Sequence, residues 1–439
     1  MAAKCLLLLL DGLGDRAHPE LQGQTPLQAA STPNLDRIAR LGSNGLFHPG
    51  AQGQAFPSEK AHFSLLGYSP VEFPGRGLLE ALGYGLEPEP RDVALLAHLA
   101  SASKREGCLF LKREAPQPPQ EEELKNLLDA LPYPCQDKMG IRFHPTRDHF
   151  GILLLSGRVS PYITDTNPMR DEVFLPELLP WENLFGEQAQ RAENTARSLK
   201  RYLIEVYTSL KDHPVNMRRI NQDLPPLNAL ITQRPGMYTS APPFSERFGL
   251  KGATVAAGAV YHGLASFLGM DAVRVRDSGD PGADLGQRVE TALRLFSETD
   301  FIHVHTKAPD TAAHSKDPQR KKEVIESLDR GLESLDPKRL LEEDILLAVT
   351  SDHSTPSSGP LIHSGEPVPL TLLSRETRRD RVFLFEEAEC ASGCLGLIRG
   401  EEFMYIILNL LDRAKLTGVM DTPRDQPYWP GEYTPFSLT

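Results

Sequence analysis

Short apolar runs alternate with helical patterns along this chain, and that alternation limits its fold more than any other feature. Residues 5–10 read CLLLLL, and the following segment 32–42 carries apolar residues at helical spacing. The same order recurs in the C-terminal half, where amphipathic segments separate the apolar runs 252–258, 271–277, 300–306 and 344–350. This order predicts an α/β fold with a mainly parallel sheet flanked by helices.

A segment of different character interrupts this order. It contains several prolines, a polar stretch APQPPQEEE, one short helical pattern and three candidate strands at 92–100, 107–114 and 150–157. We predict that residues 86–180 form a smaller inserted α+β domain, whereas residues 1–85 and 181–439 form the core. The amphipathic segment 193–212 is expected to return the chain to the main sheet.

Composition excludes several classes of function. The 439 residues carry a net charge of −12, which argues against a nucleic-acid partner because phosphate neutralisation needs a basic face. No apolar run approaches the roughly 18 residues that a membrane-spanning helix needs. Five cysteines without a CxxC pair argue against a disulfide framework or a zinc knuckle. We therefore expect a cytoplasmic protein without a membrane partner.

Three apolar runs end in acidic residues. Asp11 closes the first run, Asp310 follows the run 300–306, and Asp352 follows the run 344–350. Each residue alone is typical of a turn or a helix cap. Because the carboxyl ends of parallel strands meet at one edge of a sheet, we expect the three carboxylates to converge there.

Histidines accompany two of these acidic residues. His314 stands four residues after Asp310, a spacing that places both side chains on one helical face. His353 adjoins Asp352, and His363 follows across a loop rich in Ser, Pro and Gly. Mixed carboxylate and imidazole ligands suit borderline cations better than Ca²⁺. The pattern therefore predicts two divalent metal ions, Mn²⁺ or Zn²⁺.

Ser58 interrupts the apolar and proline-containing stretch AFPSEKAHFSLLGY. A serine in a loop is usually a cap, but a serine beside divalent cations can act as a nucleophile toward phosphorus. We predict that Ser58 carries a phosphoryl group as phosphoserine. One metal at Ser58 would then be held by Asp11, Asp352 and His353, and the second by Asp310, His314 and His363.

Several strings in this order resemble the archaeal-type cofactor-independent phosphoglycerate mutases of the alkaline phosphatase superfamily. They are DGLGDR (11–16), TPLQAASTPNLDRIARLGSNGL (25–46), PSEKAHFSLLGYSP (57–70), FPGRGLLEALGYGL (73–86), KAPDTAAH (307–314) and SDHSTP (351–356) with His363. The resemblance implies that Ser58 is the nucleophile and that all seven of these metal ligands are present: Asp11, Ser58, Asp310, His314, Asp352, His353 and His363. It further implies that Lys307 takes part in catalysis and substrate binding, and that the substrates are 3- and 2-phosphoglycerate.

The chain departs from the family pattern inside the insertion. Leu96 and His98 stand where the family has Arg and Asn, Phe150 stands where it has an arginine, and LKREAP (111–116) replaces DRRAGR. Leucine and phenylalanine cannot bind a carboxylate or phosphate as arginine does. The remaining candidate substrate cations are Lys307, Arg113, Arg170, Arg219 and Arg234.

Three functions are compatible with these residues. The first is a phosphoglycerate mutase with a rebuilt substrate clamp. The second is a phosphohydrolase or mutase that acts on another phosphate ester, and the third is a metal-binding relative without turnover. The retained serine between two predicted metal sites favours the two enzymes, whose partner would be a small phosphorylated metabolite. The sequence leaves the oligomeric state open.

Overall fold

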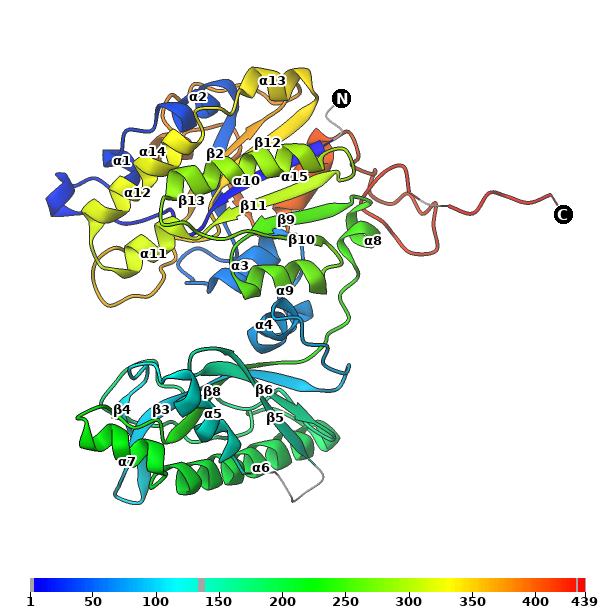
Figure 1. The fold of residues 1–439 in the computed structure, drawn as a ribbon. Helices are drawn as coiled ribbons and strands as arrows, with labels where there is room; N and C mark the ends of the chain where they lie inside the picture. The colour runs from blue at the N-terminus through cyan, green and yellow to red at the C-terminus, as the bar shows by residue number, and fades with distance from the viewer. Residues whose placement is uncertain (1–3, 133–138, 432, 439) are drawn as a thin grey trace. The chain divides into compact units, whose positions relative to one another are not determined.

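The protein consists of two compact units in a computed structural model that describes residues 4–132, 139–431 and 433–438. Unit 1 runs to Phe73 and resumes at Ser240, and unit 2 spans Pro74–Thr239. Figure 1 shows the elements of each unit.

Unit 1 contains an eight-stranded sheet with the strand order β10-β9-β11-β1-β12-β13-β2-β14. The neighbouring strands β11, β1 and β12 are parallel, whereas β13 is antiparallel to both β12 and β2. The predicted α/β fold with a mainly parallel sheet is therefore confirmed. The bounds are β1 (Lys4–Leu10), β2 (Ser43–His48), β9 (Gly252–Ala256), β10 (Asp271–Arg274), β11 (Phe301–Thr306), β12 (Ile345–Thr350), β13 (Val368–Leu373) and β14 (Gly396–Arg399).

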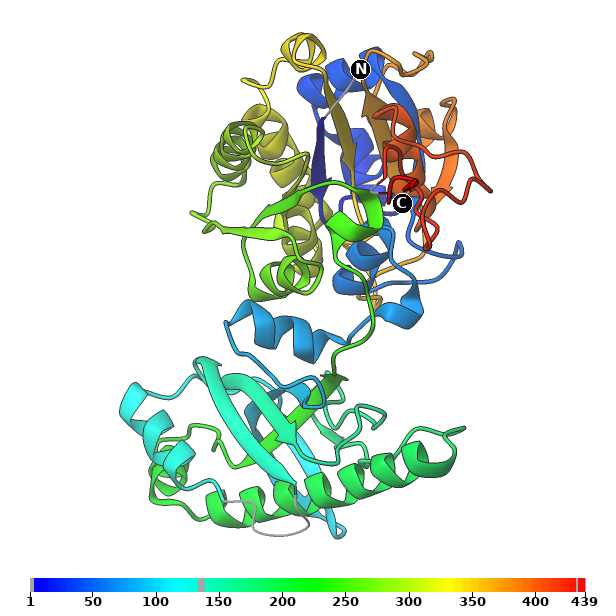
Figure 2. The same cartoon turned by 90° about the vertical axis from the view of Figure 1, so that its right-hand side faces the viewer.

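Helices cover both faces of this sheet (Figures 1 and 2). They are α1 (Pro26–Ala29), α2 (Pro33–Leu41), α3 (Ser58–Leu65), α8 (Phe244–Phe248), α9 (Ala259–Phe267), α10 (Pro281–Leu295), α11 (Ala308–His314), α12 (Pro318–Gly331), α13 (Pro337–Glu342), α14 (Glu387–Ala391) and α15 (Glu402–Leu410). Leu6 and Leu8 of β1 pack in one cluster with Val289 of α10 and Leu328 of α12. Leu7 is also fully buried but points to the opposite face, because side chains alternate along a strand. Burial on both faces explains the continuous CLLLLL run.

Unit 2 is built on an antiparallel sheet with the order β5-β6-β3-β4-β7, and β8 pairs with β3. Its elements are β3 (Val93–Arg105), β4 (Cys108–Arg113), β5 (Gly140–Arg147), β6 (Phe150–Ser156), β7 (Val173–Phe174), β8 (Ala229–Gly236), α4 (Arg76–Gly83), α5 (Glu121–Asp129), α6 (Gly186–Leu210) and α7 (Pro214–Asn221). The apolar stripe of α6, which includes Leu199 and Val206, packs against Leu95 and Leu153 of the sheet.

Unit 2 is larger than the predicted insertion of residues 86–180. The structure adds α4 before that range and α6, α7 and β8 after it. The segment 193–212, expected to return to the main sheet, lies in unit 2 because α6 covers the sheet of unit 2. Pairing of β8 with β3, from Ala94 to Ala100, holds the returning strand in the same unit. An amphipathic helix can pack on the sheet of either unit, so the apolar stripe of α6 could not by itself predict to which unit the helix belongs.

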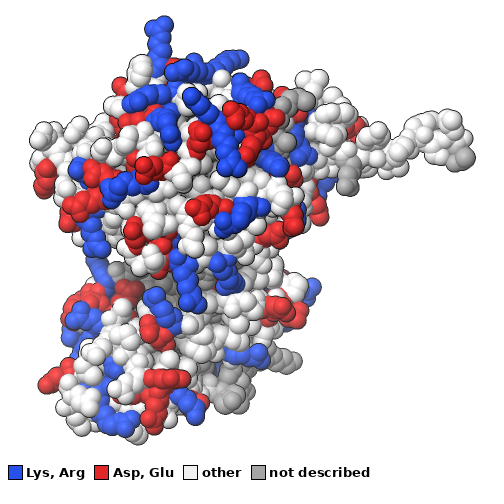
Figure 3. All heavy atoms as spheres, turned by 45° about the horizontal axis from the view of Figure 1, so that its top comes forward, with Lys and Arg blue, Asp and Glu red and all other residues white. Residues whose placement is uncertain are grey.

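Acidic and basic side chains are interspersed on the molecular face shown in Figure 3, without a continuous basic patch. Among the residues that the structure describes, no helix is both long and apolar enough to cross a membrane. The cysteines described, Cys5, Cys108, Cys390 and Cys394, are all unpaired.

Candidate active site

The site lies where three neighbouring strands of unit 1 end. Asp11 directly follows β1, and Asp352 lies just beyond β12. Beyond β11 the chain enters α11, whose first turn carries Asp310. The strands are parallel and in register, with Leu10 opposite Thr306 and Leu9 opposite Thr350. The three carboxylates therefore meet at one edge of the sheet, and each is fully buried.

Gly12 permits the close approach of β1 and α11. Its φ of 67° lies in the left-handed region, and a Cβ atom there would lie 2.7 Å from Asp310 Cβ and 2.6 Å from Thr355 Oγ1. Asp310 N donates a hydrogen bond to Asp11 O at 3.0 Å across this contact. Any larger residue would force the two acidic segments apart.

Ser58 opens α3 and lies beside one cluster of ligating atoms. Its Oγ lies 3.0 Å from His353 Nε2 and 3.5 Å from Asp11 Oδ1. His353 Nε2 is in turn 3.1 Å from Asp352 Oδ2 and 3.6 Å from Asp11 Oδ1. Ligands about 2.1 Å from a tetrahedral metal lie about 3.4 Å from each other. The spacing in this cluster therefore fits a single divalent cation.

A second cluster surrounds Asp310. Its Oδ2 lies 3.3 Å from His314 Nε2, and its Oδ1 lies 3.4 Å from His363 Nε2. Asp310 also forms a compact group of potential ligands with His353 and His363, and the rings of these two histidines stack with their centroids 3.9 Å apart. His353 thus belongs to both clusters, so the two candidate metal sites adjoin each other.

The buried carboxylates are held in their charged form by neighbouring cations. Although burial alone would raise the pKa of Asp310, hydrogen bonds from His314 and His363 and the charge of Lys307 hold it well below the ordinary value. Burial opposes protonation of His353, but the charge of Asp352 raises the pKa of its imidazole to about 9. The site therefore concentrates negative charge that favours cations.

Asp352 provides a direct test of whether a metal fits. Its Oδ2 is buried, and neither His353 Nε2 at 3.1 Å nor His62 Nδ1 at 3.3 Å forms a well-aligned hydrogen bond with it. A buried carboxylate oxygen without such a bond is costly unless a ligand meets it. The donor atoms present fit a divalent metal ion at this point.

Lys307 contacts Ser58 and a carboxylate of each cluster. Its Nζ lies 2.9 Å from Asp310 Oδ2 and 3.6 Å from Asp11 Oδ2, and it donates a hydrogen bond to Ser58 Oγ at 3.3 Å. Burial would lower the pKa of Lys307, but the charges of Asp11 and Asp310 raise it instead. Lys307 is therefore a cation directed at the serine.

Further residues of the site were not identified from the sequence. His62 donates to Ser58 O at 2.8 Å from the next turn of α3, and His305 donates to Asp11 Oδ2 at 2.9 Å. Thr355 donates to Asp310 Oδ1 at 2.8 Å. His62 could have been found from the sequence, because its spacing of four residues from Ser58 places both on one helical face. Tyr261 also donates a hydrogen bond to Asp11, but no sequence pattern marks it.

The four arginines predicted to bind substrate all lie in unit 2. Arg113 forms an ion pair with Asp171 at 3.1 Å, and the buried Arg219 donates to Gln117 O at 2.7 Å and to Pro225 O at 3.0 Å. Arg170 is exposed, and Arg234 is half-buried. The guanidinium of Arg219 is therefore committed to the interior of unit 2.

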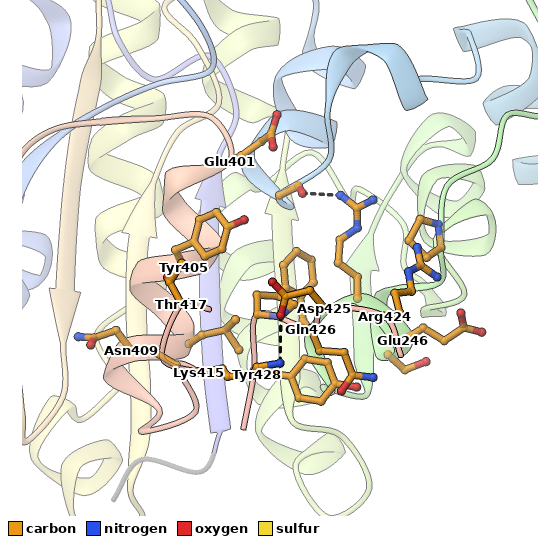
Figure 4. A pocket seen from close by; sticks show the side chains of 18 of the residues that line it. Glu246, Glu401, Tyr405, Asn409, Lys415, Thr417, Arg424, Asp425, Gln426 and Tyr428 are labelled. Carbon is orange, nitrogen blue, oxygen red and sulfur yellow. Dashed lines mark hydrogen bonds and ion pairs between the residues drawn. The ribbon is translucent and has the colours of Figure 1, made fainter. Parts of the chain in front are cut away.

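A separate pocket of about 920 Å³ lies in unit 1, between α15 and the C-terminal segment (Figure 4). Tyr405, Lys415 and Tyr428 line it, and its lining includes none of the metal-site candidates or Ser58. Lys415 Nζ is occupied by ion pairs with Asp421 at 2.9 Å and Asp425 at 3.0 Å. This pocket is distinct from the cluster of ligating residues.

Comparisons with known proteins show a likeness over nearly the whole chain. A family model described as the metalloenzyme superfamily matches residues 3–410. The 2,3-bisphosphoglycerate-independent phosphoglycerate mutase 2 of Methanocaldococcus jannaschii is 40% identical over 433 residues, which cover 97% of each chain. The mutase of the same kind from Methanopyrus kandleri is 36% identical over 94% of this chain and 98% of its own.

A solved structure shows the same likeness. The cofactor-independent phosphoglycerate mutase of Thermoplasma acidophilum is 31% identical, with a TM-score of 0.64 over 93% of this chain and 100% of its own. The family match over residues 3–410 spans unit 2, most of unit 1 and all the metal-site candidates. The chain therefore belongs to the cofactor-independent phosphoglycerate mutase family within the metalloenzyme superfamily.

Proposed function

We propose that this enzyme interconverts 3- and 2-phosphoglycerate by transferring the phosphoryl group through Ser58. One observation carries the proposal: Ser58 Oγ lies within 3.5 Å of His353 Nε2, Asp11 Oδ1 and Lys307 Nζ. The names of the relatives supply the substrate class.

The residues around Ser58 suit phosphoryl transfer in several ways. Divalent ions held by the two clusters would supply Lewis acidity, which activates a hydroxyl group and neutralises phosphoryl charge. Ser58 is the first residue of α3, and the positive end of a helix favours an anion there. Lys307 adds a full positive charge beside Ser58 Oγ. Serine thereby accepts the phosphoryl group from one hydroxyl of glycerate and returns it to the other.

Mn²⁺ or Zn²⁺ is the cofactor that we propose. Each cluster mixes carboxylate oxygen with imidazole nitrogen, and imidazole suits these cations better than Mg²⁺ or Ca²⁺. The free cysteines are compatible with a cytoplasmic enzyme, the location that we propose.

Phosphorus NMR tests the proposal in one tube. The purified protein is incubated with Mn²⁺ and 3-phosphoglycerate, and the signals of both phosphoglycerates and of free phosphate are followed. We expect the 2-phosphoglycerate signal to grow until equilibrium, with little free phosphate. Free phosphate alone, or no change, would overturn the mutase assignment.

A second candidate function is transfer or hydrolysis of a different phosphate ester. Two buried histidines of unit 2 favour this second function. His98 Nε2 and both ring nitrogens of His149 have no hydrogen-bond partner among the described residues. The ring of Phe150 packs against both imidazoles, with its centroid 4.8 Å from that of His98 and 4.5 Å from that of His149. Burial and His149 lower the pKa of His98 to about 4, so His98 is neutral near pH 7.

Neutral imidazoles and an aromatic ring suit an uncharged or aromatic group better than a carboxylate. If this candidate is correct, a panel of phosphate esters will show a compound with such a group that is turned over faster than 3-phosphoglycerate. Equal or slower turnover of every ester in the panel would exclude this candidate.

A further inference from the structure

The two oxygens of the Asp11 carboxylate have different partners. Oδ1 lies on the side of the nucleophile, 3.5 Å from Ser58 Oγ and 3.6 Å from His353 Nε2. Oδ2 accepts a hydrogen bond of 2.7 Å from the Tyr261 hydroxyl and one of 2.9 Å from His305 Nε2. One oxygen is thus available to a cation at Ser58, while the other is held by the protein.

Tyr261 reaches Asp11 from α9, an element that carries no predicted metal ligand. Its side chain is buried, and its ring lies against His305 with centroids 3.7 Å apart and against His62 at 5.1 Å. Packing against two rings leaves the hydroxyl little freedom to turn away from the carboxylate.

The same hydroxyl also accepts a hydrogen bond from Lys307 Nζ at 3.4 Å. Lys307 in turn donates to Ser58 Oγ at 3.3 Å. Tyr261 therefore contacts both a predicted metal ligand and the cation beside the nucleophile. No hydrogen bond or ion pair between Tyr261 and Ser58 is present.

We propose that Tyr261 is a positioning residue that orients Asp11 for the metal at Ser58 and holds Lys307 beside the serine. The inference rests on the proposed function, and it adds a residue from α9 to the machinery. Tyr261 and His305 saturate Oδ2, so Asp11 presents a single oxygen to the cation. Groups that orient a ligand in this way typically change metal affinity or activity by about 10- to 100-fold when they are removed.

Tyr261→Phe is the test, because phenylalanine keeps the ring and removes only the hydroxyl. Tyr68→Phe is a matched control: Tyr68 is also buried in unit 1, and its hydroxyl donates one hydrogen bond of 2.9 Å to Pro242 O. Each protein is prepared without metal, and its Mn²⁺ affinity is measured in competition with a chromogenic chelator. Melting temperatures of the metal-free proteins are measured alongside, together with kcat and KM.

We expect Tyr261→Phe to lower the Mn²⁺ affinity by about 10- to 100-fold and to reduce kcat with little change in KM. Tyr68→Phe should leave both the Mn²⁺ affinity and kcat unchanged. Wild-type Mn²⁺ affinity in Tyr261→Phe would overturn the proposal, whatever the value of kcat. Equal losses in both variants would also overturn it, because the loss would then be a general effect of removing a buried hydroxyl.

The metal measurement separates this inference from the proposed function. Mn²⁺ competition needs no substrate, so it remains decisive if the wild-type protein does not act on 3-phosphoglycerate. A normal affinity for Mn²⁺ in Tyr261→Phe contradicts orientation of Asp11 whichever ester is the substrate. A metal-free melting temperature like that of the wild type would establish that Tyr261→Phe folds.

Discussion

Ser58 Oγ lies 3.0 Å from His353 Nε2, although 295 residues separate the two in sequence. One residue begins α3, and the other lies in the loop after β12. Each is buried, and each also lies within 3.6 Å of Asp11 Oδ1. The serine and the imidazole are therefore neighbours at one candidate cation site.

Ser58→Ala should abolish phosphoryl transfer while metal content and fold remain nearly intact, because only the nucleophilic oxygen is removed. Ser64→Ala is a matched control on the same helix, since its buried hydroxyl donates to Pro49 O at 2.7 Å. Activity is followed by phosphorus NMR, and metal content by elemental analysis. Full activity in Ser58→Ala would exclude the serine as the nucleophile.

Removal of metal with EDTA should abolish activity and lower the melting temperature. Cations bound only to the folded state stabilise it, by about 2.7 kcal/mol per site at a concentration 100 times the dissociation constant. Removal also leaves the carboxylates of Asp11, Asp310 and Asp352 close together without a divalent counterion. Differential scanning calorimetry with and without EDTA measures the change. Identical melting curves would argue against both metal sites.

Lys307→Met should reduce kcat by about 10²- to 10³-fold, because a cation aimed at the transferring group stabilises the transition state. Lys316→Met is the control, since Lys316 Nζ donates to Pro356 O at 2.8 Å and Leu361 O at 2.7 Å and does not contact Ser58. Steady-state kinetics at saturating Mn²⁺ measure both variants. An equal effect of the two substitutions would remove Lys307 from the catalytic set.

Lys321→Met should destabilise unit 1 by about 3–5 kcal/mol, because it leaves the buried charge of Asp15 unpaired. Lys321 Nζ donates to Gly14 O at 2.8 Å, Thr355 O at 2.8 Å and Asp15 Oδ2 at 3.1 Å. These bonds join the loops that follow β1 and β12, which carry candidate metal ligands. Urea denaturation measures the loss.

Lys322→Met controls for this loss, since Lys322 forms a partly exposed ion pair with Glu326 on the same helix and should change stability by less than about 1 kcal/mol. Addition of Asp15→Asn to Lys321→Met should restore part of the loss, because the unpaired charge is removed. Similar losses from Lys321→Met and Lys322→Met would contradict the role of the buried pair.

Glu387 should make folding less favourable as the pH rises. Burial raises the pKa of its carboxyl to about 7, from an ordinary value of 4.5. Between these pH values the folded state binds more protons than the unfolded state, so the free energy of unfolding falls as pH rises, by at most about 3 kcal/mol. Above pH 7 this contribution is constant.

Glu387→Gln should remove this dependence and stabilise the protein at pH 8, because the buried side chain no longer ionises. Urea denaturation of both proteins from pH 5 to pH 8 provides the comparison. A slope in Glu387→Gln as steep as in the wild type would assign the dependence to other groups.

Local sequence patterns determined the class of the fold and most of the candidate site. Continuous apolar runs such as 5–10 predict buried strands, and helical spacing predicts α2 and α10, because both patterns depend on neighbouring residues. Asp11, Asp310 and Asp352 could be placed together because strand ends of a parallel sheet share one edge. Ser58 could be placed among them only through the resemblance and through its chemistry.

Tertiary structure decided what depends on contacts between distant residues. The stripe of α6 fits any apolar sheet face, and only its packing on β3 and β6 assigns it to unit 2. Arg219 looks like a candidate for substrate binding in sequence, but its guanidinium is buried among backbone oxygens. Tyr261 lies in a helical pattern without distinguishing features, and only the fold brings its hydroxyl to Asp11. Periodicity encodes which face of an element is apolar, whereas the partner of a polar group is set by the packing of whole elements.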